Sequence, residues 1–175
     1  MREEKVILVD ENDNEIGTET KILAHQRGQC HRAFSVFIFH RNQNEIKLLL
    51  QQRQKDKYHS GGLWTNTCCS HPRPGENIIL AGERRLKEEM GMEIKLALAG
   101  HFHYRAECEN GLIENEYDHV LVGFAPVDDI HFNPTEVAAV RWITMTDLFN
   151  ALENHPKQFT VWFKQALFIA TQHLL

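Results

Sequence analysis

Short apolar runs separated by polar, turn-forming residues set the pattern of the first half of the chain. Residues 6–9 and 33–39 are rich in β-branched and aromatic side chains, and each run is predicted to form a β-strand. Residues 46–50 form a third apolar run, and the polar segment 42–44 before it is typical of a hairpin turn. Residues 64–69 are also β-prone. This half of the chain is therefore predicted to supply several strands of a sheet.

A helix is predicted at the centre of the chain, over residues 78–90. Ile79 and Leu86 recur at a helical spacing and would share one apolar face. Asn77 precedes the helix, and its side chain can accept hydrogen bonds from free N–H groups of the first turn. Gly91 follows the helix and can adopt the left-handed conformation that ends many helices.

The second half returns to strand patterns and then becomes helical. Residues 96–106 and 112–125 are predicted strands, and the Asn-Gly pair at 110–111 is a strong hairpin signal between them. Residues 138–144 are a further predicted strand. Two C-terminal segments show helical periodicity: residues 147–153 and 158–175. Together these elements predict a mixed β-sheet sandwiched between helices, an α/β or α+β fold.

Length and charge narrow the function classes. The 175 residues agree with one domain over the whole chain, residues 1–175. The chain begins with charged residues and has no apolar run near the ~20 residues that a membrane helix needs, so we expect a cytoplasmic protein without a membrane partner. The net charge of −5 argues against nucleic-acid binding. An anionic ligand would therefore need a local group of cations or a metal ion.

Histidine is the unusual entry in the composition. The chain has eleven histidines, and histidine is the commonest metal ligand in proteins. Its four cysteines are not expected to form disulfides in a cytoplasmic protein. Several histidines have no suggestive neighbours in the sequence and are expected to be scattered surface residues: His40, His59, His131, His155 and His173.

The densest cluster of reactive side chains lies at residues 64–72. Cys69 and His71 are two positions apart, so an extended backbone would point them to one face and Cys68 to the other. Free cysteines are most often small buried hydrophobes. Alternatively, Cys69 lines a site beside a metal-bound His71, but the residues alone favour the buried hydrophobe.

Two further pairs could complete a metal site. Glu114 and Glu116 would project from one face of a strand, where a cation between them would relieve their repulsion. His25 and His31 lie just before the long apolar strand. With His71, these residues would form a set of three nitrogen and two carboxylate ligands. Such a set suits octahedral Mn²⁺ or Mg²⁺ better than tetrahedral zinc, although zinc can occupy it.

A competing pair of histidines lies in the strand predicted over residues 96–106. His101 and His103 share one face of that strand, and Phe102 and Tyr104 share the other. Only one face of this strand can line a site, and periodicity does not decide which face that is.

The charged helix over residues 83–91 resembles a Nudix box, in which helix carboxylates hold Mg²⁺ on a diphosphate. The match is degraded, because Ser70 and Arg85 replace the glycine and the first helix glutamate of that motif. Glu88 and Glu89 remain in register. The simpler interpretation is a solvated helix face with ion pairs between residues four apart, such as Arg85 and Glu89.

Taken together, these segments resemble type 1 isopentenyl diphosphate isomerase, a Nudix-fold family. The most specific pieces are residues 64–72, 104–106 and 114–116, and the resemblance extends from about Gly17 to the C-terminal helices. It implies a Nudix-type fold and a five-carbon isoprenoid diphosphate as substrate. The implied reaction moves the double bond of isopentenyl diphosphate by one position to give dimethylallyl diphosphate, through a tertiary carbocation. We expect a monomer.

The resemblance also implies roles for individual residues. One ion, Mn²⁺ or Mg²⁺ with zinc as an alternative, would be held by His25, His31, His71, Glu114 and Glu116. That assignment leaves His101 and His103 structural and turns the Tyr104 face inward. Glu89 would hold a second ion, Mg²⁺, that arrives with the diphosphate. The diphosphate would be bound by Lys21, Arg53, Lys57 and Arg85.

The same resemblance assigns the acid–base groups. Cys69 would act on one face of the substrate, and Glu116, helped by Tyr104, on the opposite face. A thiol near cations and a metal is expected to reach the thiolate at moderate pH. Trp162 would stabilise the carbocation through its π-face.

Two other functions are weighed against this one. A Nudix pyrophosphohydrolase would cleave a nucleoside diphosphate derivative, but Arg85 removes a carboxylate from the metal-binding helix. In a non-catalytic binding module, Cys69, His71 and the glutamates would only stabilise the fold through a metal.

Overall fold

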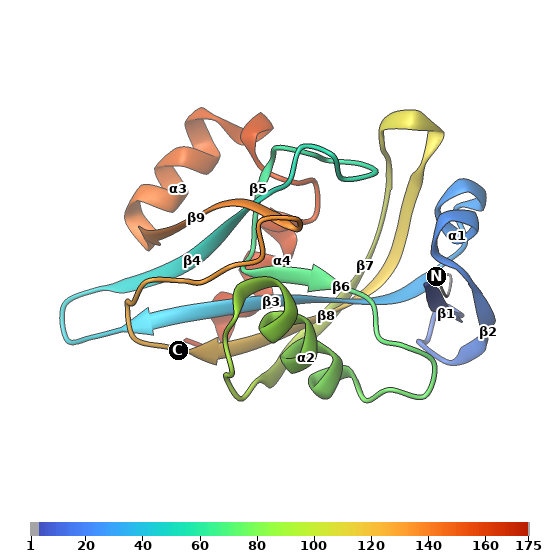
Figure 1. Ribbon diagram of the computed structural model, residues 1–175, viewed down its shortest axis with the longest axis horizontal. Coiled ribbons are helices and arrows are strands. Elements are labelled where there is room, and N and C mark those ends of the chain that lie inside the picture. The colour runs from blue at the N-terminus through green and yellow to red at the C-terminus, as the bar shows by residue number, and fades with distance from the viewer. Residues whose placement is uncertain (1–3, 175) are drawn as a thin grey trace.

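One mixed β-sheet organises the computed structural model, which describes residues 4–174 (Figure 1). Its strands are β1 (Lys5–Val9), β2 (Glu15–Thr20), β3 (His31–Arg41), β4 (Ile46–Arg53), β5 (Trp64–Thr65), β6 (Cys68–Ser70), β7 (Ala97–Glu107), β8 (Ile113–Phe124) and β9 (Val137–Thr144). The helices are α1 (Lys21–Arg27), α2 (Ile78–Met90), α3 (Met145–Asn154) and α4 (Phe163–Gln172), with 3₁₀ turns η1 (Glu109–Gly111) and η2 (Pro156–Gln158).

Strand β3 lies at the centre of the sheet. It pairs with β1, β4 and β6 in antiparallel fashion and with β8 in parallel, while β7 extends the sheet from β8 and β9 from β4. In the parallel pair, His31 lies opposite Glu116 and Phe39 opposite Phe124. The expected hairpins β3–β4 and β7–β8 are both present.

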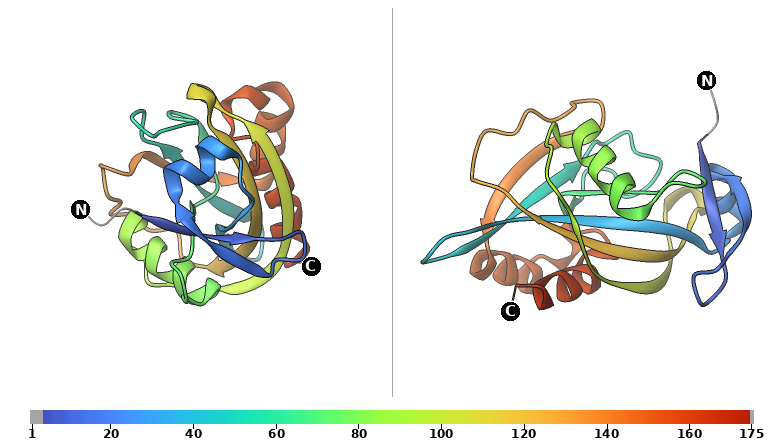
Figure 2. Two further views of the ribbon diagram at one scale, coloured as in Figure 1. Left: turned by 90° about the vertical axis from the view of Figure 1, so that its right-hand side faces the viewer. Right: turned by 90° about the horizontal axis from the view of Figure 1, so that it is seen from below.

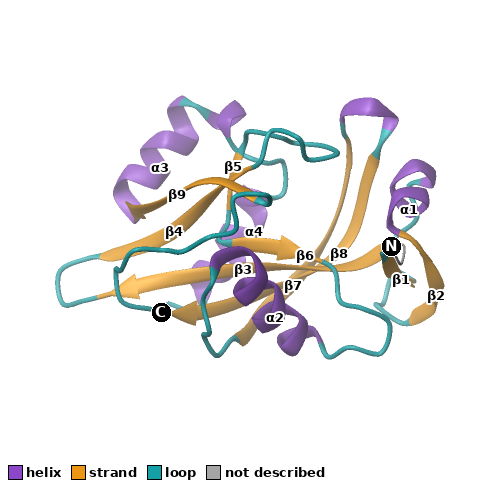
Figure 3. Cartoon of the chain, viewed as in Figure 1, coloured by secondary structure: helices purple, strands orange, loops and turns teal. Residues whose placement is uncertain are grey.

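Helices cover both faces of this sheet. Phe34 and Ile38 of β3 pack in one apolar cluster with α2. Phe37 and Phe39 point the other way and pack with α3 and α4, where Phe163 stacks on Phe37. Figure 2 shows α2 on one side of the sheet and α3 and α4 on the other, and Figure 3 shows the strands enclosed between them. The predicted mixed sheet between helices is confirmed, and the two buried faces of β3 explain its continuous apolar sequence.

Local signals placed helix α2 correctly. The Asn77 side chain accepts hydrogen bonds from two backbone N–H groups of the first turn. Gly91 ends the helix in the left-handed region, at φ 66°. Gly82 allows close packing on the sheet, because a Cβ atom there would lie 2.4 Å from Leu121 Cδ1. This packing places the charged face of α2 beside the strands that carry the candidate site.

Residues 64–69 differ from the single extended segment that was predicted. They form two short strands, β5 and β6, separated at Asn66 and Thr67. The Thr67 hydroxyl donates to Leu49 O at 2.6 Å and accepts from Ile38 N at 2.9 Å. These side-chain hydrogen bonds replace a strand ladder, so the chain can bend while its buried polar groups stay satisfied.

Three further segments differ from their predictions. Strand β2 was not predicted, because its polar sequence shows no apolar alternation. Helix α1 was not predicted either. The C-terminal helix α4 is shorter than residues 158–175, since Thr160 N donates to Trp64 O at 3.0 Å and interrupts the helical pattern before it. Residue 175 lies outside the described residues.

The lengths of the helices and the state of the cysteines can also be described. Every helix within residues 4–174 is too short or too polar to cross a bilayer. All four cysteines are free, as expected: Cys30, Cys68, Cys69 and Cys108. The first residues of the charged N-terminus, 1–3, lie outside the described part of the chain.

Candidate active site

A buried centre of histidine and glutamate side chains forms where several elements meet. His25 comes from α1, His31 begins β3 and His71 follows β6, while Glu114 and Glu116 project from β8. All five side chains are buried. The parallel register of β3 and β8 sets His31 beside Glu116. The fold therefore brings together the five residues expected to hold an ion.

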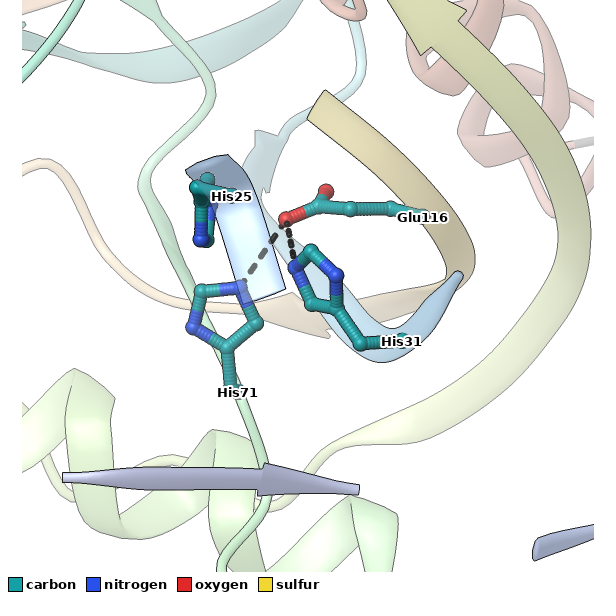
Figure 4. Close-up of side chains that lie close together, drawn as sticks. All are labelled: His25, His31, His71 and Glu116. Atoms are coloured by element: carbon teal, nitrogen blue, oxygen red, sulfur yellow. Dashed lines mark hydrogen bonds and ion pairs between the residues drawn. The ribbon is translucent and has the colours of Figure 1, made fainter. Parts of the chain in front are cut away.

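Glu116 lies at the middle of this centre (Figure 4). Its Oε1 atom is 2.9 Å from His71 Nε2 and 3.4 Å from His31 Nε2. Candidate ligand atoms of these three residues and of His25 all lie within 4.8 Å of one another. His25 Nε2 is also 3.5 Å from Glu114 Oε1, which links the second carboxylate to the group.

The charges of the centre are set by burial and by mutual contact. Burial would raise the pKa of Glu116, but contacts with His31 and His71 hold this pKa well below its usual range. Burial and the charge of Glu116 would raise the pKa of Glu114, but contacts with His25 and a further histidine lower it. Burial lowers the pKa of His71 to about 4. The centre therefore combines ionised carboxylates with a neutral His71 at neutral pH, whereas contact with Glu116 raises the pKa of His31.

Buried polar atoms without partners test the fit of a cation. In the described part of the chain, Nε2 of His25 and of His31 and Oε2 of Glu114 are buried and make no hydrogen bond. Nδ1 of His25 lies 2.7 Å from Lys21 O, and Nδ1 of His31 lies 2.9 Å from Gln29 O. Such contacts orient the rings of metal-bound histidines and leave Nε2 free to bind. The group fits a divalent ion.

The strand face left open by periodicity is the Tyr104 face. The Tyr104 hydroxyl donates to Glu116 Oε2 at 2.7 Å. His101 and His103 lie on the exposed face instead, where His103 Nε2 is 2.7 Å from Asn115 Oδ1. The two oxygens of Glu116 therefore serve different partners: Oε1 faces the imidazoles and Oε2 the phenol.

Cys69 lies in β6 beside Arg53. The Arg53 Nη1 atom is 3.8 Å from the sulfur. Burial raises the pKa of the Cys69 thiol to about 12, although the guanidinium of Arg53 opposes this shift. The structure therefore favours the thiol form of Cys69 over the thiolate that nearby cations can support, because loss of solvent outweighs one nearby cation.

Trp162 closes the same region from the start of α4. Its side chain is buried, and Nε1 donates to Asn66 Oδ1 at 3.2 Å. The indole lies against Tyr104, with ring centroids 6.2 Å apart, and the Arg53 Cζ atom lies 5.5 Å from its centroid. A small cavity of about 30 Å³ is lined by Trp162, Cys69, Tyr104 and Glu116, among others. The expected acid–base groups thus meet the aromatic surface in one place.

A larger cavity of about 750 Å³ adjoins this small one, and Arg53, Cys69 and His71 line both. All the residues expected to bind the diphosphate or its Mg²⁺ line the larger cavity: Lys21, Arg53, Lys57, Arg85 and Glu89. The cations come from α1, β4, the loop after β4 and α2. Segments far apart in the sequence therefore create a locally cationic surface on an acidic chain.

Carboxylates of the chain hold these cations in place. Lys21 Nζ lies 3.1 Å from Glu4 Oε2, and Lys57 contacts Glu136. Arg85 pairs with Glu88 at 2.7 Å and also contacts Glu89. A second contact fixes Glu89, because Gln51 Nε2 donates to its Oε2 at 3.0 Å.

Sequence patterns did not indicate two residues of this region. His59 was expected to be a scattered surface residue, but its side chain is buried and Nε2 contacts Glu114 Oε1. The neighbouring Tyr58 is half-buried and lies under Lys21, whose Nζ is 4.9 Å from the ring centroid. Both residues lie in the β4–β5 loop, which has no periodicity that could reveal the direction of a side chain. His131, His155 and His173 are exposed, as expected.

The sequence of the chain is similar to those of several known proteins. A family model described as NUDIX domain matches residues 30–163. The chain is 48% identical over 167 residues to an isopentenyl-diphosphate Delta-isomerase of Photobacterium profundum, covering 94% of this chain and 93% of the relative. It is 46% identical over 165 residues to isopentenyl-diphosphate Delta-isomerase 2 of Aromatoleum aromaticum, covering 94% of this chain and 85% of the relative.

A crystal structure of a Deinococcus radiodurans protein shares the fold, with a TM-score of 0.68 at 18% sequence identity, covering 87% of this chain and 90% of that one. At such low identity the likeness concerns the fold alone. The sequence relatives are more specific, since they extend over nearly the whole chain. The chain therefore belongs to the isopentenyl-diphosphate Delta-isomerase family and contains a NUDIX domain.

Proposed function

We propose that this protein interconverts isopentenyl diphosphate and dimethylallyl diphosphate. The observation that carries the proposal is that Cys69 and the Glu116–Tyr104 pair line one small cavity, which opens beside the cationic cavity. A double-bond shift needs groups that add a proton at one carbon and remove one at another. The names of relatives that are 46% and 48% identical over most of the chain support the same reaction.

In this proposal, the larger cavity binds the diphosphate. Lys21, Lys57 and Arg85 present positive charges along its wall. Arg53 lies at the junction of the two cavities and would orient the first phosphate relative to Cys69. We assign Mg²⁺ to the diphosphate and Glu89 as its protein ligand, because hard cations are bound by carboxylate and phosphate oxygens. The substrate class is then a five-carbon isoprenoid diphosphate.

Two groups beside the small cavity hold the protons that the reaction needs. Cys69 Sγ carries one, and the Tyr104 hydroxyl shares its proton with the ionised Glu116. Because the reaction is an interconversion, each of these groups gives a proton in one direction and accepts one in the other. The carbocation formed between the two steps would lie near the indole of Trp162, whose π-face offers about 0.5–2 kcal/mol to a cation.

We propose that the buried centre holds Mn²⁺ or Mg²⁺, with zinc as the alternative, through His25, His31, His71, Glu114 and Glu116. Such an ion would supply a fixed positive charge that stabilises the ionised form of Glu116. His31 and His71 hold the Oε1 side of that carboxylate, so its Oε2 atom remains directed at Tyr104. The chain thus orients the acid–base group toward the small cavity.

The pyrophosphohydrolase remains the less specific alternative. Arg85 lies on the helix that would supply metal-binding carboxylates, and it pairs with Glu88 and Glu89. Arg85 stands where the Nudix box has its first helix glutamate, so the helix offers one carboxylate fewer for the metal ions that would activate water in hydrolysis. This loss favours diphosphate binding over its cleavage.

An isomerisation assay in deuterated buffer tests the proposal. The purified chain, Mn²⁺, Mg²⁺ and isopentenyl diphosphate should yield dimethylallyl diphosphate, with deuterium in the product and in recovered substrate by NMR. Cys69→Ala is the matched control and should show neither label nor product above background. Release of phosphate without dimethylallyl diphosphate would favour the hydrolase. Absence of any turnover, with unfolding by a chelator in circular dichroism, would favour the binding module.

We further propose that the enzyme works as a cytoplasmic monomer. Its four free cysteines are typical of a reducing compartment. All the expected site residues come from one chain, so catalysis needs no second subunit. Gel filtration of the active protein measures the oligomeric state directly.

A further inference from the structure

His59 is a buried histidine outside the expected ligand set. It lies in the loop between β4 and β5, its side chain is only 3% exposed, and Nε2 contacts Glu114 Oε1. This Nε2 atom makes no hydrogen bond within the described residues. A buried polar atom without a hydrogen bond is costly, so the site needs a partner for it.

The surroundings of His59 repeat those of His25 and His31. In each of the three rings, Nδ1 lies close to an oxygen of a nearby residue, and for His59 this oxygen is Ser60 Oγ at 3.1 Å. In each ring, Nε2 faces a carboxylate and makes no hydrogen bond with the described part of the chain. A proton on Nδ1 leaves the Nε2 lone pair free, which is the usual form of a metal-bound imidazole.

The position of His59 also connects it to the rest of the centre. Candidate ligand atoms of His59, His25 and Glu114 lie within 4.8 Å of one another. His25 belongs at the same time to the group formed with His31, His71 and Glu116. Because the two groups share His25, residues of both groups can bind one ion.

The β4–β5 loop is fixed against the end of the β7–β8 hairpin, toward which it extends in Figure 1. Ser60 N donates to Glu109 Oε2 at 3.1 Å. Arg53 Nη2 donates to the carbonyl oxygen of His59, also at 3.1 Å. The Tyr58 ring packs edge-on against His59, with centroids 4.3 Å apart. These contacts hold the imidazole over Glu114 without requiring a metal.

We infer that His59 is a further protein ligand, through Nε2, of the ion in the buried centre. The inference rests on the metal site of the proposed function. The ion would then be held by four imidazoles and two carboxylates. Six protein ligands would meet the usual coordination number of such an ion, and its positive charge would stabilise the ionised form of Glu116. Four imidazole nitrogens also favour Mn²⁺ or another transition metal over Mg²⁺.

Metal binding by the full chain tests this inference without using activity. Mn²⁺ is titrated into metal-free wild-type protein and into His59→Ala, and Kd is measured by calorimetry. We expect a loss of affinity of at least about 10-fold, since even partners outside the ligand shell contribute 10- to 100-fold to metal affinity. The d–d absorption of bound Co²⁺ should also become stronger, because such bands are weak in six-coordinate sites and intensify when a ligand is lost.

His119→Ala is the matched control. His119 is also buried, with Nδ1 3.3 Å from Ala33 O and Nε2 3.0 Å from Asp13 Oδ2. It lies in neither ligand group, so its loss should change neither Kd nor the Co²⁺ spectrum. His59→Gln provides a second test that keeps a polar side chain over Glu114 and guards against misfolding of the alanine variant.

The outcomes separate this inference from the proposed function. If wild-type protein binds neither Mn²⁺ nor Co²⁺, the metal site itself is wrong. If wild type binds both and His59→Ala has the same Kd and Co²⁺ spectrum, only the role of His59 is overturned. Full recovery of affinity and spectrum in His59→Gln would also overturn it, because His59 would then only position Glu114 by a hydrogen bond.

Discussion

The buried histidine–glutamate centre and the adjoining cationic cavity are neighbours that hold their charges in opposite ways. In the cavity, Lys21 and Lys57 each have a carboxylate partner from the chain. In the centre, Nε2 of His25 and His31 and Oε2 of Glu114 are buried without hydrogen bonds to any residue between 4 and 174. These cations of the cavity thus already have partners within the chain, whereas the centre is organised around a position where a cation fits.

This difference explains how an acidic chain can bind an anion. The carboxylates Glu4 and Glu136 keep cationic side chains at the cavity wall, where partly exposed ion pairs are weak enough for a diphosphate to replace them. The carboxylates of the centre are buried and contact imidazoles, so they cannot relax toward water. The net charge of −5 therefore does not describe either region.

We expect the greatest loss of turnover from a substitution in the histidine–glutamate centre. Glu116→Gln removes the charge that faces His31 and His71, and turnover should fall by about 10²- to 10⁴-fold, the usual contribution of an acid–base group. The rate of dimethylallyl diphosphate formation measures this loss. Binding of diphosphate should change much less, because the cationic cavity is untouched.

Asp118→Asn is the control for that variant. Asp118 projects from the same strand, and Ser35 Oγ donates to it at 2.8 Å. Burial and the charge of Glu116 raise the pKa of Asp118 well above its usual range, which favours the neutral form of this side chain. Its substitution should leave turnover within the same order of magnitude. An equal loss in both variants would show that charge at Glu116 is not the deciding factor.

A smaller effect is expected in the cavity. Lys57→Ala removes one charged hydrogen-bond donor, worth about 1.5–3 kcal/mol, so KM for isopentenyl diphosphate should rise by about 10- to 150-fold. Because this interaction is present before and during the reaction, kcat should change little. Lys55→Ala is the matched control, since Lys55 is exposed and outside the cavity lining. A fall in kcat with unchanged KM would contradict the division between the two regions.

We expect only a modest fall in kcat from a substitution of Trp162, which lies between the histidine–glutamate centre and the cationic cavity. Trp162→Phe keeps an aromatic ring but weakens its π-face, and kcat should fall by a factor of about 2 to 30, equivalent to about 0.5–2 kcal/mol. Trp142→Phe is the control, because Trp142 packs with the α2 cluster on the other face of the sheet. Thermal unfolding of both variants separates catalysis from stability. Equal kcat values for Trp162→Phe and wild type would exclude the indole from cation stabilisation.

Local signals in the sequence were sufficient for the elements that have them. Helix α2 begins after Asn77 and ends before Gly91, as predicted, because capping depends on a few neighbouring backbone groups. The apolar run of β3 predicted a strand, since both its faces are buried. Strand β2 carries neither signal, because it is polar and lies at the edge of the sheet, so its pairing with β1 could not be predicted.

Period-two alternation predicted that Tyr104 and His103 point to opposite faces, and the packing of β7 on β8 decided which face is inside. The same limit applies to His59: its partner Glu114 is distant in the sequence, and the direction of a loop side chain follows from contacts such as Ser60 with Glu109.

The amino-acid sequence was enough to predict the strands and helices that have strong local patterns, and its motifs were specific enough to indicate the family. Three properties emerged only from the fold: burial raises the pKa of Cys69, carboxylates of the chain pair with Lys21 and Lys57, and His59 faces Glu114. The reason is physical. Secondary structure depends on neighbouring residues, whereas pKa values, ion pairs and metal sites depend on solvent exclusion and on side chains that the fold brings together from distant segments.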